Sequence, residues 1–394
     1  MLKNMDSDIR KSSVILIIAI NSKNISKEII MRLKCGIVGL PNVGKSTLFN
    51  ALTASSNAEA ANYPFCTIEP NTGVVPVPDS RLNRLAKTAG SAKIIPEFIE
   101  FVDIAGLVKG ASKGEGLGNK FLSHIREVDA IIHVLRCFDD PDITHVHGKI
   151  DPVEDAEVIE TELIIADLDS VDKRLPNLIK KAKTDKILQL QVELLEICRK
   201  VLEEGRPVRS LIGKVDAKEL AALQLLTSKP ILYVCNVLES EATSGNGYSQ
   251  LVEQKTISEG ANVVIISSKI EAEISILEDP IEKQEFLESL NLSEPGLSKI
   301  IKSAHSLLGL KSFFTIGPKE AHAWTFETGS LAPAAAGIIH TDFEKGFIRA
   351  EVISCEEYLA IGSEARAKEL GKMRVEGKDY VMQDGDVVHF RFNV

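Results

Sequence analysis

The segment Gly39–Ser46, which reads Gly-Leu-Pro-Asn-Val-Gly-Lys-Ser, is the feature that most limits the folds open to this chain. It fits the pattern GxxxxGK[ST], follows the apolar run Leu33–Val38 directly and precedes the helical pattern Thr47–Ala54. A strand, a glycine-containing turn and a helix in this order form a phosphate-binding loop, because backbone N–H groups and the helix N-terminus surround an anion there. The sequence therefore predicts an α/β domain that binds a nucleoside triphosphate.

Further positions have the residue types that a nucleotide-hydrolysing switch needs. Lys45 is expected to reach the outer phosphates, and the Ser46 hydroxyl is expected to ligate Mg²⁺. Asp103 opens the sequence DIAG at the end of an apolar strand, so it can hold the magnesium shell while the Gly106 N–H contacts the γ-phosphate. Thr67, between these motifs, is the natural switch hydroxyl for Mg²⁺, and an ordinary loop threonine is the other interpretation.

The sequence Asn-Val-Leu-Glu at 236–239 follows another apolar strand, where a guanine-binding protein has Asn-Lys-x-Asp. Guanine is bound by a short carboxylate that accepts from its ring N–H and its amino group. Glu239 is one methylene longer than aspartate, and Val237 replaces the lysine that packs on the base. This motif, with Ser267–Lys269 after the last strand, argues against a guanine-specific site and favours adenine.

Apolar strand-like runs alternate with helical stretches from Arg32 onward, a pattern typical of a parallel sheet covered by helices. The runs are Leu33–Val38, Phe98–Val102, Ala130–Leu135, Ile231–Cys235 and Val263–Ile266. Residues 31–150 and 231–310 are therefore predicted to form one nucleotide-binding domain around an insertion.

The insertion, residues 151–230, has a helical period. Apolar residues recur at alternating steps of four and three in two seams: Ile164, Leu168, Val171, Leu175 and Leu178, then Ile187, Leu190, Leu194, Ile197 and Val201. A polar turn near Lys183–Asp185 separates the seams, which predicts an antiparallel helical hairpin.

Basic side chains gather near the turn of this hairpin, although the whole chain has a net charge of −10. Between residues 173 and 186 the basic residues are Lys173, Arg174, Lys180, Lys181, Lys183 and Lys186, against one acid, Asp185. A net-negative protein contacts RNA only through such a local patch. Two interpretations stay open: a tip that faces RNA, or a charged helix end that faces water.

The pattern changes again after about residue 310. Pro333–Ile338 is predicted to start a helix, and Asp379–Met382 and Val387–Phe392 are predicted strands on either side of a polar turn. Residues 311–394 are therefore expected to form a compact α+β module.

Three long segments carry a resemblance to a known family: NYPFCTIEPN at 62–71, DIAGLVKGA at 103–111 and HTDFEKGF at 340–347. Through them, and over Met31–Val394, the chain resembles the YchF/Obg-like ribosome-binding ATPases, a branch of the Obg-related translation-factor NTPases. The resemblance implies a Ras-like P-loop NTPase domain of α/β class, an inserted antiparallel coiled-coil hairpin and a C-terminal β-grasp (TGS) domain. It also implies a preference for ATP over GTP, dependence on Mg²⁺, binding to ribosomes and rRNA, and a monomer in the cytoplasm without membrane contact.

The family's functional positions carry over residue by residue. Its nucleotide-binding residues fall on Asn42, Val43, Gly44, Lys45, Ser46 and Thr47, and on Asn236, Val237 and Glu239 for the base. Its metal-binding residues fall on Ser46 and Thr67, which Asp103 joins as a magnesium-shell residue. Lys45 and Gly106 complete the set expected to act on the transferred phosphoryl group.

One catalytic group of Ras-type enzymes is missing. A glutamine just after Asp-x-x-Gly orients the attacking water in those enzymes, but Leu107 occupies this place. In similar proteins a histidine from a mobile loop is thought to substitute, and the matching position here is His145; a surface histidine without a role is the other interpretation. His124 and His133 lie within apolar helix and strand patterns and are expected to be structural.

Asn42 suggests a second cofactor. Related cation-activated NTPases use an asparagine at this point of the phosphate loop to hold potassium against the phosphates. Potassium is therefore a candidate beside Mg²⁺, and simple bracing of the loop by Asn42 is the alternative.

The remaining features concern the cellular setting. The six cysteines are scattered without a CxxC pair, which fits a reducing cytosol better than a zinc site or a disulfide framework. Residues 1–30 precede Met31 and are expected to be an extension from an upstream start codon. Their apolar run Val14–Ile20 is too short to span a membrane.

The sequence thus predicts a Mg²⁺-dependent ATPase, weaker as a GTPase, that acts as a nucleotide switch on the ribosome. Two alternatives stay open. One is a GTP-specific Obg-type GTPase. The other is a nucleotide-gated RNA-binding or ribosome-binding regulator whose hydrolysis is incidental.

Overall fold

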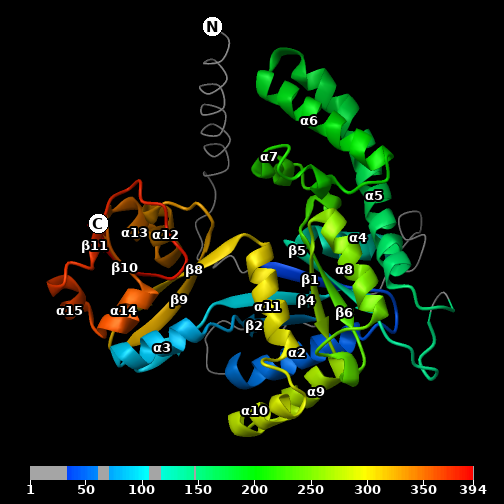
Figure 1. The fold of residues 1–394 in the computed structure, drawn as a ribbon. Helices are drawn as coiled ribbons and strands as arrows, with labels where there is room; N and C mark the ends of the chain where they lie inside the picture. The colour runs from blue at the N-terminus through cyan, green and yellow to red at the C-terminus, as the bar shows by residue number, and fades with distance from the viewer. Residues whose placement is uncertain (1–32, 61–70, 106–116, 146–147, 394) are drawn as a thin grey trace.

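The computed structural model describes residues 33–60, 71–105, 117–145 and 148–393. The expected extension at 1–30, the switch residue Thr67 and Gly106 lie outside these residues. The described chain forms two sheets and a helical arm that extends away from them (Figure 1). Within the described residues, no helix has both the length and the apolar character that crossing a bilayer requires.

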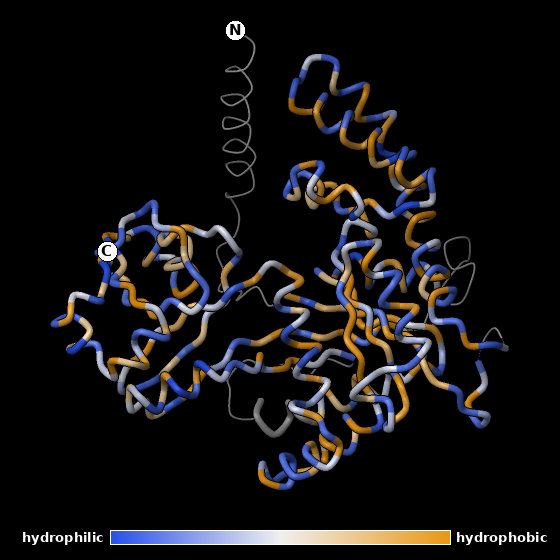
Figure 2. Tube along the Cα trace, in the orientation of Figure 1, coloured by the Kyte–Doolittle hydropathy of each residue, from blue (hydrophilic) through white to orange (hydrophobic). Residues whose placement is uncertain are grey.

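The first sheet has six strands in the order β2-β4-β1-β5-β6-β7. Its strands are β1 (Lys34–Val38), β2 (Thr72–Pro76), β4 (Phe98–Asp103), β5 (Ala130–Arg136), β6 (Ile231–Asn236) and β7 (Asn262–Ile266). All neighbouring pairs are parallel except β2 and β4. The five apolar runs seen in the sequence are the five parallel strands, and hydrophobic residues dominate the centre of this sheet (Figure 2).

Helices α2 (Lys45–Ala60), α4 (Leu117–Glu127), α8 (Gly247–Glu259) and α11 (Gly296–Leu307) pack on this sheet. Helix α9 (Ser268–Ile276) packs on α2, and α10 (Pro280–Ser289) packs with α9 in a separate small cluster. The central strand β5 is buried at every residue and packs against both α11 and α5, the first helix of the arm. Burial on both faces explains why β5 is an unbroken apolar run.

The arm begins with α5 (Pro152–Lys181), a helix of 30 residues that Asp151 caps through its side chain. A 3-10 turn, η1 (Ala182–Thr184), leads into α6 (Lys186–Glu203), which Asp185 caps in the same way. The return path contains η2 (Val208–Leu211), α7 (Ala217–Ala222) and η3 (Leu226–Ser228).

The two arm helices share a small apolar core, but the seam on α6 differs from the predicted one. Leu194 and Val201 are buried, whereas Leu190 and Ile197 are 51% and 45% exposed. Leu195, Cys198 and Leu202 take their place in the core. The strict alternation of three and four was wrong on α6 because the returning segment packs on an adjacent face of the helix and widens the apolar stripe.

The second sheet has the order β11-β10-β12-β8-β9-β3. Its strands are β3 (Lys93–Ile95), β8 (Leu310–Ile316), β9 (Glu320–Glu327), β10 (Phe347–Ser354), β11 (Arg374–Glu376) and β12 (Asp386–Phe392). The accompanying helices are α12 (Ala332–Ile339), α13 (Thr341–Lys345), α14 (Cys355–Ile361) and α15 (Glu364–Glu369). The expected strand Asp379–Met382 is absent; in this segment Val381 forms only an isolated bridge with Leu331.

One part of this sheet comes from early in the chain. Helix α3 (Ser80–Ala89) buries Leu82 and Leu85 in a cluster with Phe314 and Ile353. Strand β3, which follows it, pairs in parallel with β9. Both elements fall inside the range 31–150 that the sequence analysis gave to the nucleotide-binding domain, and their packing on the second sheet was not anticipated.

All cysteines of the described residues are buried and unpaired: Cys35, Cys137, Cys198, Cys235 and Cys355. Burial raises the pKa of the Cys198 thiol to about 11, so this thiol is protonated and unreactive at neutral pH.

Candidate nucleotide-binding site

The phosphate loop connects β1 to α2 and depends on unusual backbone geometry. Asn42 and Gly44 have positive φ angles of 63° and 95°. A Cβ atom on Gly44 would lie 2.3 Å from Asn236 Nδ2, and one on Gly39 would lie 2.7 Å from the Val134 carbonyl oxygen. Both glycines are therefore required by close approaches, and Gly44 also by its conformation.

Asn236 connects the phosphate loop to the start of α9. Its Nδ2 donates to the Val43 carbonyl oxygen at 2.9 Å, and its Oδ1 accepts from the Ser268 N–H at 2.8 Å. The side chain is buried at the end of β6. The sequence analysis placed Asn236 at the base; here its amide braces the phosphate loop against the start of α9.

Lys45 and Asp103 meet at the phosphate end. Lys45 is the first residue of α2 and Asp103 the last of β4, and their side chains form an ion pair. Both side chains are largely shielded from solvent, 11% and 15% exposed. The structure thus brings together two residues that lie in separate motifs 58 positions apart.

Ser46 and Thr47 follow on the exposed first turn of α2. A hydroxyl and a carboxylate are hard oxygen ligands of the kind that Mg²⁺ prefers. Ser46 and Asp103 therefore fit a magnesium ion, and the first N–H groups of α2 lie where an anion would bind.

His145 lies on the loop after β5. Its Nε2 is 2.9 Å from Oδ2 of Asp155 in the first turn of α5, and the residue is buried. The carbonyl oxygen of Thr144, one residue earlier, accepts a hydrogen bond of 3.2 Å from Asn42 Nδ2. The backbone of this loop is therefore at the phosphate loop, while the imidazole is bound to the arm helix.

The other two histidines differ from His145. His133 is buried in β5 with its ring 5.6 Å from that of Tyr233, and burial lowers its pKa to about 3. His124 is exposed on α4, away from the apolar side of the helix.

The loop after β6 presents different side chains from those expected. Val237 is buried in the core of the first sheet and its N–H donates to the Ile266 carbonyl oxygen, so its side chain is not open to a base. Glu239 forms an ion pair with Lys269, and the hydrogen bond from Lys269 lowers the pKa of Glu239. Leu238 is the exposed apolar side chain here, a position that the sequence analysis did not single out.

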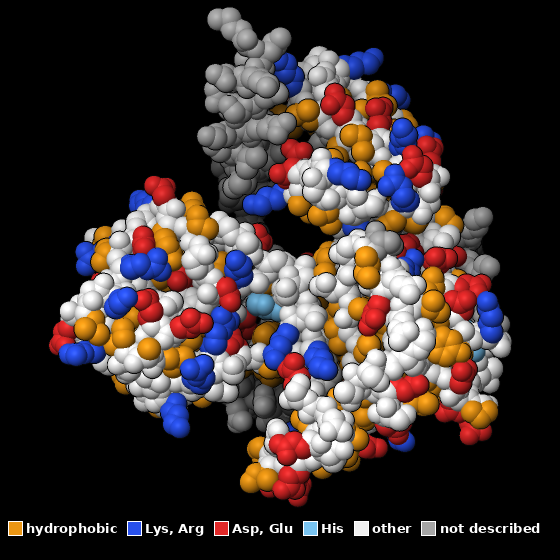
Figure 3. Space-filling view, in the orientation of Figure 1, with side chains coloured by type: hydrophobic (Ala, Val, Ile, Leu, Met, Phe, Trp, Pro, Cys, Tyr) orange, Lys and Arg blue, Asp and Glu red, His pale blue; other side chains and the backbone are white. Residues whose placement is uncertain are grey.

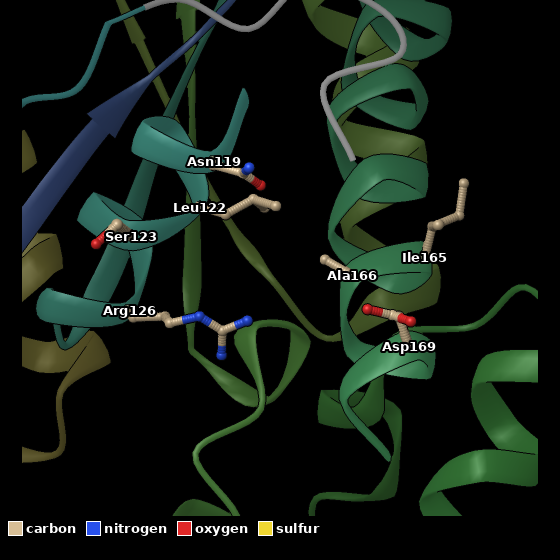
Figure 4. A pocket seen from close by; sticks show the side chains of 7 residues that line it. All are labelled: Asn119, Leu122, Ser123, Arg126, Ile165, Ala166 and Asp169. Carbon is tan, nitrogen blue, oxygen red and sulfur yellow. The ribbon is translucent and has the colours of Figure 1, made fainter. Parts of the chain in front are cut away.

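A separate groove lies between α4 and α5, with a volume of about 460 Å³ (Figure 4). Leu122 and Arg126 on α4 face Ala166 and Asp169 on α5 across it. None of the nucleotide-site residues that the structure describes lines this groove.

The chain matches known proteins along most of its length. Residues 34–191 match a family described as a 50S ribosome-binding GTPase, and residues 310–393 match the YchF-GTPase_C family, described as a protein of unknown function. The ribosome-binding ATPase YchF of Bacillus subtilis (strain 168) is 55% identical over 368 residues, 92% of this chain and 100% of the relative. The protein of the same name from Escherichia coli O157:H7 is 53% identical with the same coverage.

A solved structure agrees with these relatives. The Schizosaccharomyces pombe YchF GTPase has a TM-score of 0.81 at 39% identity, covering 91% of this chain and 98% of that one. The resemblance found in the sequence and the predicted α/β fold class with a C-terminal β-sheet domain are confirmed. The chain belongs to the YchF family of ribosome-binding ATPases.

Proposed function

We propose that this protein is a Mg²⁺-dependent ATPase that acts as a nucleotide switch on the ribosome. The observation that carries the proposal is the phosphate loop, closed by Asn236 and joined to Asp103 through Lys45. Relatives named ribosome-binding ATPases are 53% and 55% identical over nearly the whole chain. The geometry of the phosphate loop and the names of these relatives both support hydrolysis of a nucleoside triphosphate.

In this proposal each residue has a distinct task. Lys45 leaves Asp103 to contact the outer phosphates, and the first amides of α2 bind phosphate oxygens. Ser46 and Asp103, with Thr67, would hold Mg²⁺, which neutralises charge on the phosphates when bound. The Gly106 amide contacts the γ-phosphate, and His145 orients the attacking water in place of the missing glutamine.

The base loop supports ATP over GTP. Guanine recognition needs a carboxylate that is free to accept two hydrogen bonds. Glu239 is longer than the required aspartate and is already paired with Lys269. Adenine needs one acceptor and one donor, which backbone groups of residues 236–239 can supply.

Asn42 has two possible tasks. Its Nδ2 donates to the Thr144 carbonyl oxygen, so the side chain braces the loop after β5 against the phosphate loop. This hydrogen bond leaves Oδ1, the atom that would ligate potassium, available for a cation. Turnover in potassium and sodium buffers separates the two roles, because equal turnover would leave only the bracing role.

The arm supplies the surface for RNA. Lys173 pairs with Asp169 at 2.5 Å, and Arg174 donates to the Leu223 carbonyl oxygen. Among the basic residues between 173 and 186, those that are exposed and form no ion pair with any described residue are Lys180, Lys181, Lys183 and Lys186. Figure 3 shows basic side chains interspersed with acidic ones on the arm. These four lysines at the tip are proposed to contact rRNA phosphates. A monomer that works on ribosomes in the cytoplasm is the setting in which we propose that this contact is made.

The deciding experiment compares ATP and GTP binding and turnover, each with and without ribosomes. Tighter ATP binding with turnover that ribosomes stimulate supports the switch. Tighter GTP binding would show a GTPase instead. Ribosome binding that depends on nucleotide but is unchanged in a hydrolysis-dead variant would show a regulator whose hydrolysis is incidental.

A further inference from the structure

His145 is held by the helix that forms the arm. The distance between His145 Nε2 and Asp155 Oδ2 is 2.9 Å, and only 5% and 1% of these side chains are exposed. The imidazole is therefore covered by protein atoms.

The backbone beside His145 is nevertheless fixed at the phosphate loop. Asn42 Nδ2 donates to the Thr144 carbonyl oxygen at 3.2 Å, and the His145 carbonyl oxygen accepts from the Gly148 N–H at 3.2 Å. The main chain thus brings His145 next to the phosphate loop, while its imidazole contacts Asp155 of α5.

Helix α5 connects this contact to the arm. Asp155 lies in its first turn, and the helix continues to Lys181 near the tip. Ala156 and Leu163 pack in the core of the first sheet, whereas Val171 packs in the core of the arm. One helix belongs to both cores. Displacement of the arm when its tip binds a partner would therefore also displace the first turn of α5, which contacts His145.

A groove beside α5 lies on the side toward which this helix could tilt. The groove of about 460 Å³ separates α5 from α4 (Figure 4). Leu122 and Arg126 line one wall, and Ile165 and Asp169 line the other. Tilting of α5 toward α4 would narrow this groove.

We propose that Asp155 is a positioning residue that restrains His145 until the arm engages its partner. The inference rests on the proposed function, in which His145 orients the attacking water. Release of the imidazole from Asp155 is then the step that makes hydrolysis respond to the arm. Both the arm and the loop after β5 act on the same element, the first turn of α5.

The test uses Asp155→Asn in the full chain, with Glu154→Gln as the matched control. Glu154 precedes Asp155 in the same turn, but it is exposed and pairs with Lys149 at 3.2 Å. Two quantities are measured: ATP turnover with and without ribosomes, and the rate at which diethyl pyrocarbonate modifies His145, read by peptide mass spectrometry.

Asp155→Asn is expected to raise ribosome-free turnover about threefold or more with little change in KM, because release affects the chemical step and not binding. Stimulation by ribosomes should shrink by a similar factor, and His145 should be modified faster. Glu154→Gln should resemble the wild type in ribosome-free turnover, in stimulation by ribosomes and in the modification rate of His145. If Asp155→Asn melts well below this control, Asp155→Ser is the second variant.

Several results would overturn the inference. Slower turnover with faster modification of His145 would mean that Asp155 orients the active imidazole. If Asp155→Asn raises ribosome-free turnover but ribosomes stimulate it as strongly as the wild type, then the contact between His145 and Asp155 does not respond to the arm. A gain that persists in Asp155→Asn/His145→Ala would show that it does not act through His145.

His145→Ala alone separates this inference from the proposed function. Wild-type turnover in that variant would remove the water-positioning role of His145. The modification rates of the two proteins that retain His145, wild type and Asp155→Asn, would still decide whether Asp155 restrains the ring.

Discussion

Lys45 is the residue whose loss should affect nucleotide binding most directly. In the structure it compensates the charge of Asp103, and in the nucleotide complex it is proposed to contact the outer phosphates. Replacing it with alanine removes a charge-assisted hydrogen bond of about 2–3 kcal/mol, which corresponds to about a hundredfold weaker binding of Mg-ATP. Isothermal titration calorimetry measures this, and Lys87→Ala, an exposed lysine on α3, should bind like the wild type. Unchanged affinity in Lys45→Ala would contradict the phosphate-loop assignment.

Glu239 is expected to set the choice of base. Shortening it to aspartate moves the carboxylate toward the position that accepts from guanine, and it weakens the pair with Lys269. We expect Glu239→Asp to shift the GTP/ATP affinity ratio toward GTP by about tenfold, equivalent to about 1.4 kcal/mol. Fluorescent-nucleotide competition measures the ratio, with Glu282→Asp on α10 as the distant control. A wild type that binds GTP more tightly than ATP would refute both this expectation and the ATPase proposal.

Residues in short motifs could be located from the sequence, but only some of their partners could. Asp103 ends β4, and Lys45 belongs to the loop and helix that follow the carboxyl end of the neighbouring parallel strand β1, so their meeting was foreseeable. The contact between His145 and Asp155 has no such pattern, because a loop and a helix turn meet only through tertiary packing. Val237 shows the same limit: its place in a motif indicated contact with the base, but its burial is decided by the strand beside it.

At the scale of elements, the arm tip should provide the salt-dependent part of ribosome binding. Neutralising Lys180, Lys181 and Lys183 to glutamine removes three exposed charges that no described acid pairs with. Binding should weaken and the slope of log K against log salt should flatten by roughly two to three, because fewer counterions are released from RNA. Co-sedimentation with ribosomes at several salt concentrations measures both.

The control for the tip variant is a triple substitution with the same change in net charge elsewhere. Lys87→Gln, Lys283→Gln and Lys299→Gln lie on α3, α10 and α11, away from the arm. If this control flattens the slope equally, the effect comes from overall charge, and the tip is only a solvated helix end.

An ion pair between strands β10 and β12 should make the stability of the second sheet depend on pH in the acidic range. Arg391 donates to both Glu351 carboxylate oxygens, at 3.0 and 3.2 Å, and lowers the pKa of Glu351 to about 2. Since this pKa is lower in the folded than in the unfolded chain, its stabilisation is present at neutral pH and is lost as pH falls from about 4.5 toward 2. Glu351→Gln should cost about 1 kcal/mol at pH 7 and progressively less below pH 4.5. Urea unfolding at several pH values measures this, and an equal cost at pH 7 and pH 3 would contradict it.

Elements with a strong period were predictable, whereas those that depend on a distant partner were not. The five parallel strands are apolar runs because both of their faces are covered. Strand β2 is an edge strand with alternating burial, and β3 has three residues without a buried one, so neither has a clear signal in the sequence. The segment 379–382 has three consecutive apolar residues, but Tyr380 and Met382 pack in the core of the second sheet, and only Val381 forms a bridge, to Leu331.

At the scale of the whole molecule, the segment around α3 joins the two sheets. Arg81 donates to Asp79 in its own loop and to Asp384 of the C-terminal module, the latter at 2.8 Å. Leu85, from the same helix, is fully buried against residues that follow it by more than two hundred positions, among them Phe314. The C-terminal module of 311–394 therefore completes its core and its sheet edge with residues 80–95.

This arrangement predicts a selective effect of a core substitution. Leu85→Ala leaves a cavity in the second sheet's core and should destabilise it by about 2–5 kcal/mol, although Leu85 lies between two strands of the first sheet in the sequence. Hydrogen exchange should accelerate in β8, β9 and β12 and stay near wild type in β1, β5 and β6. Leu52→Ala is the matched control, because Leu52 is equally buried but lies on α2 against the first sheet, so its acceleration should fall on β1 and β4. If Leu85→Ala instead loosens the first sheet, then α3 belongs energetically to the nucleotide-binding domain, and the two sheets are not joined through it.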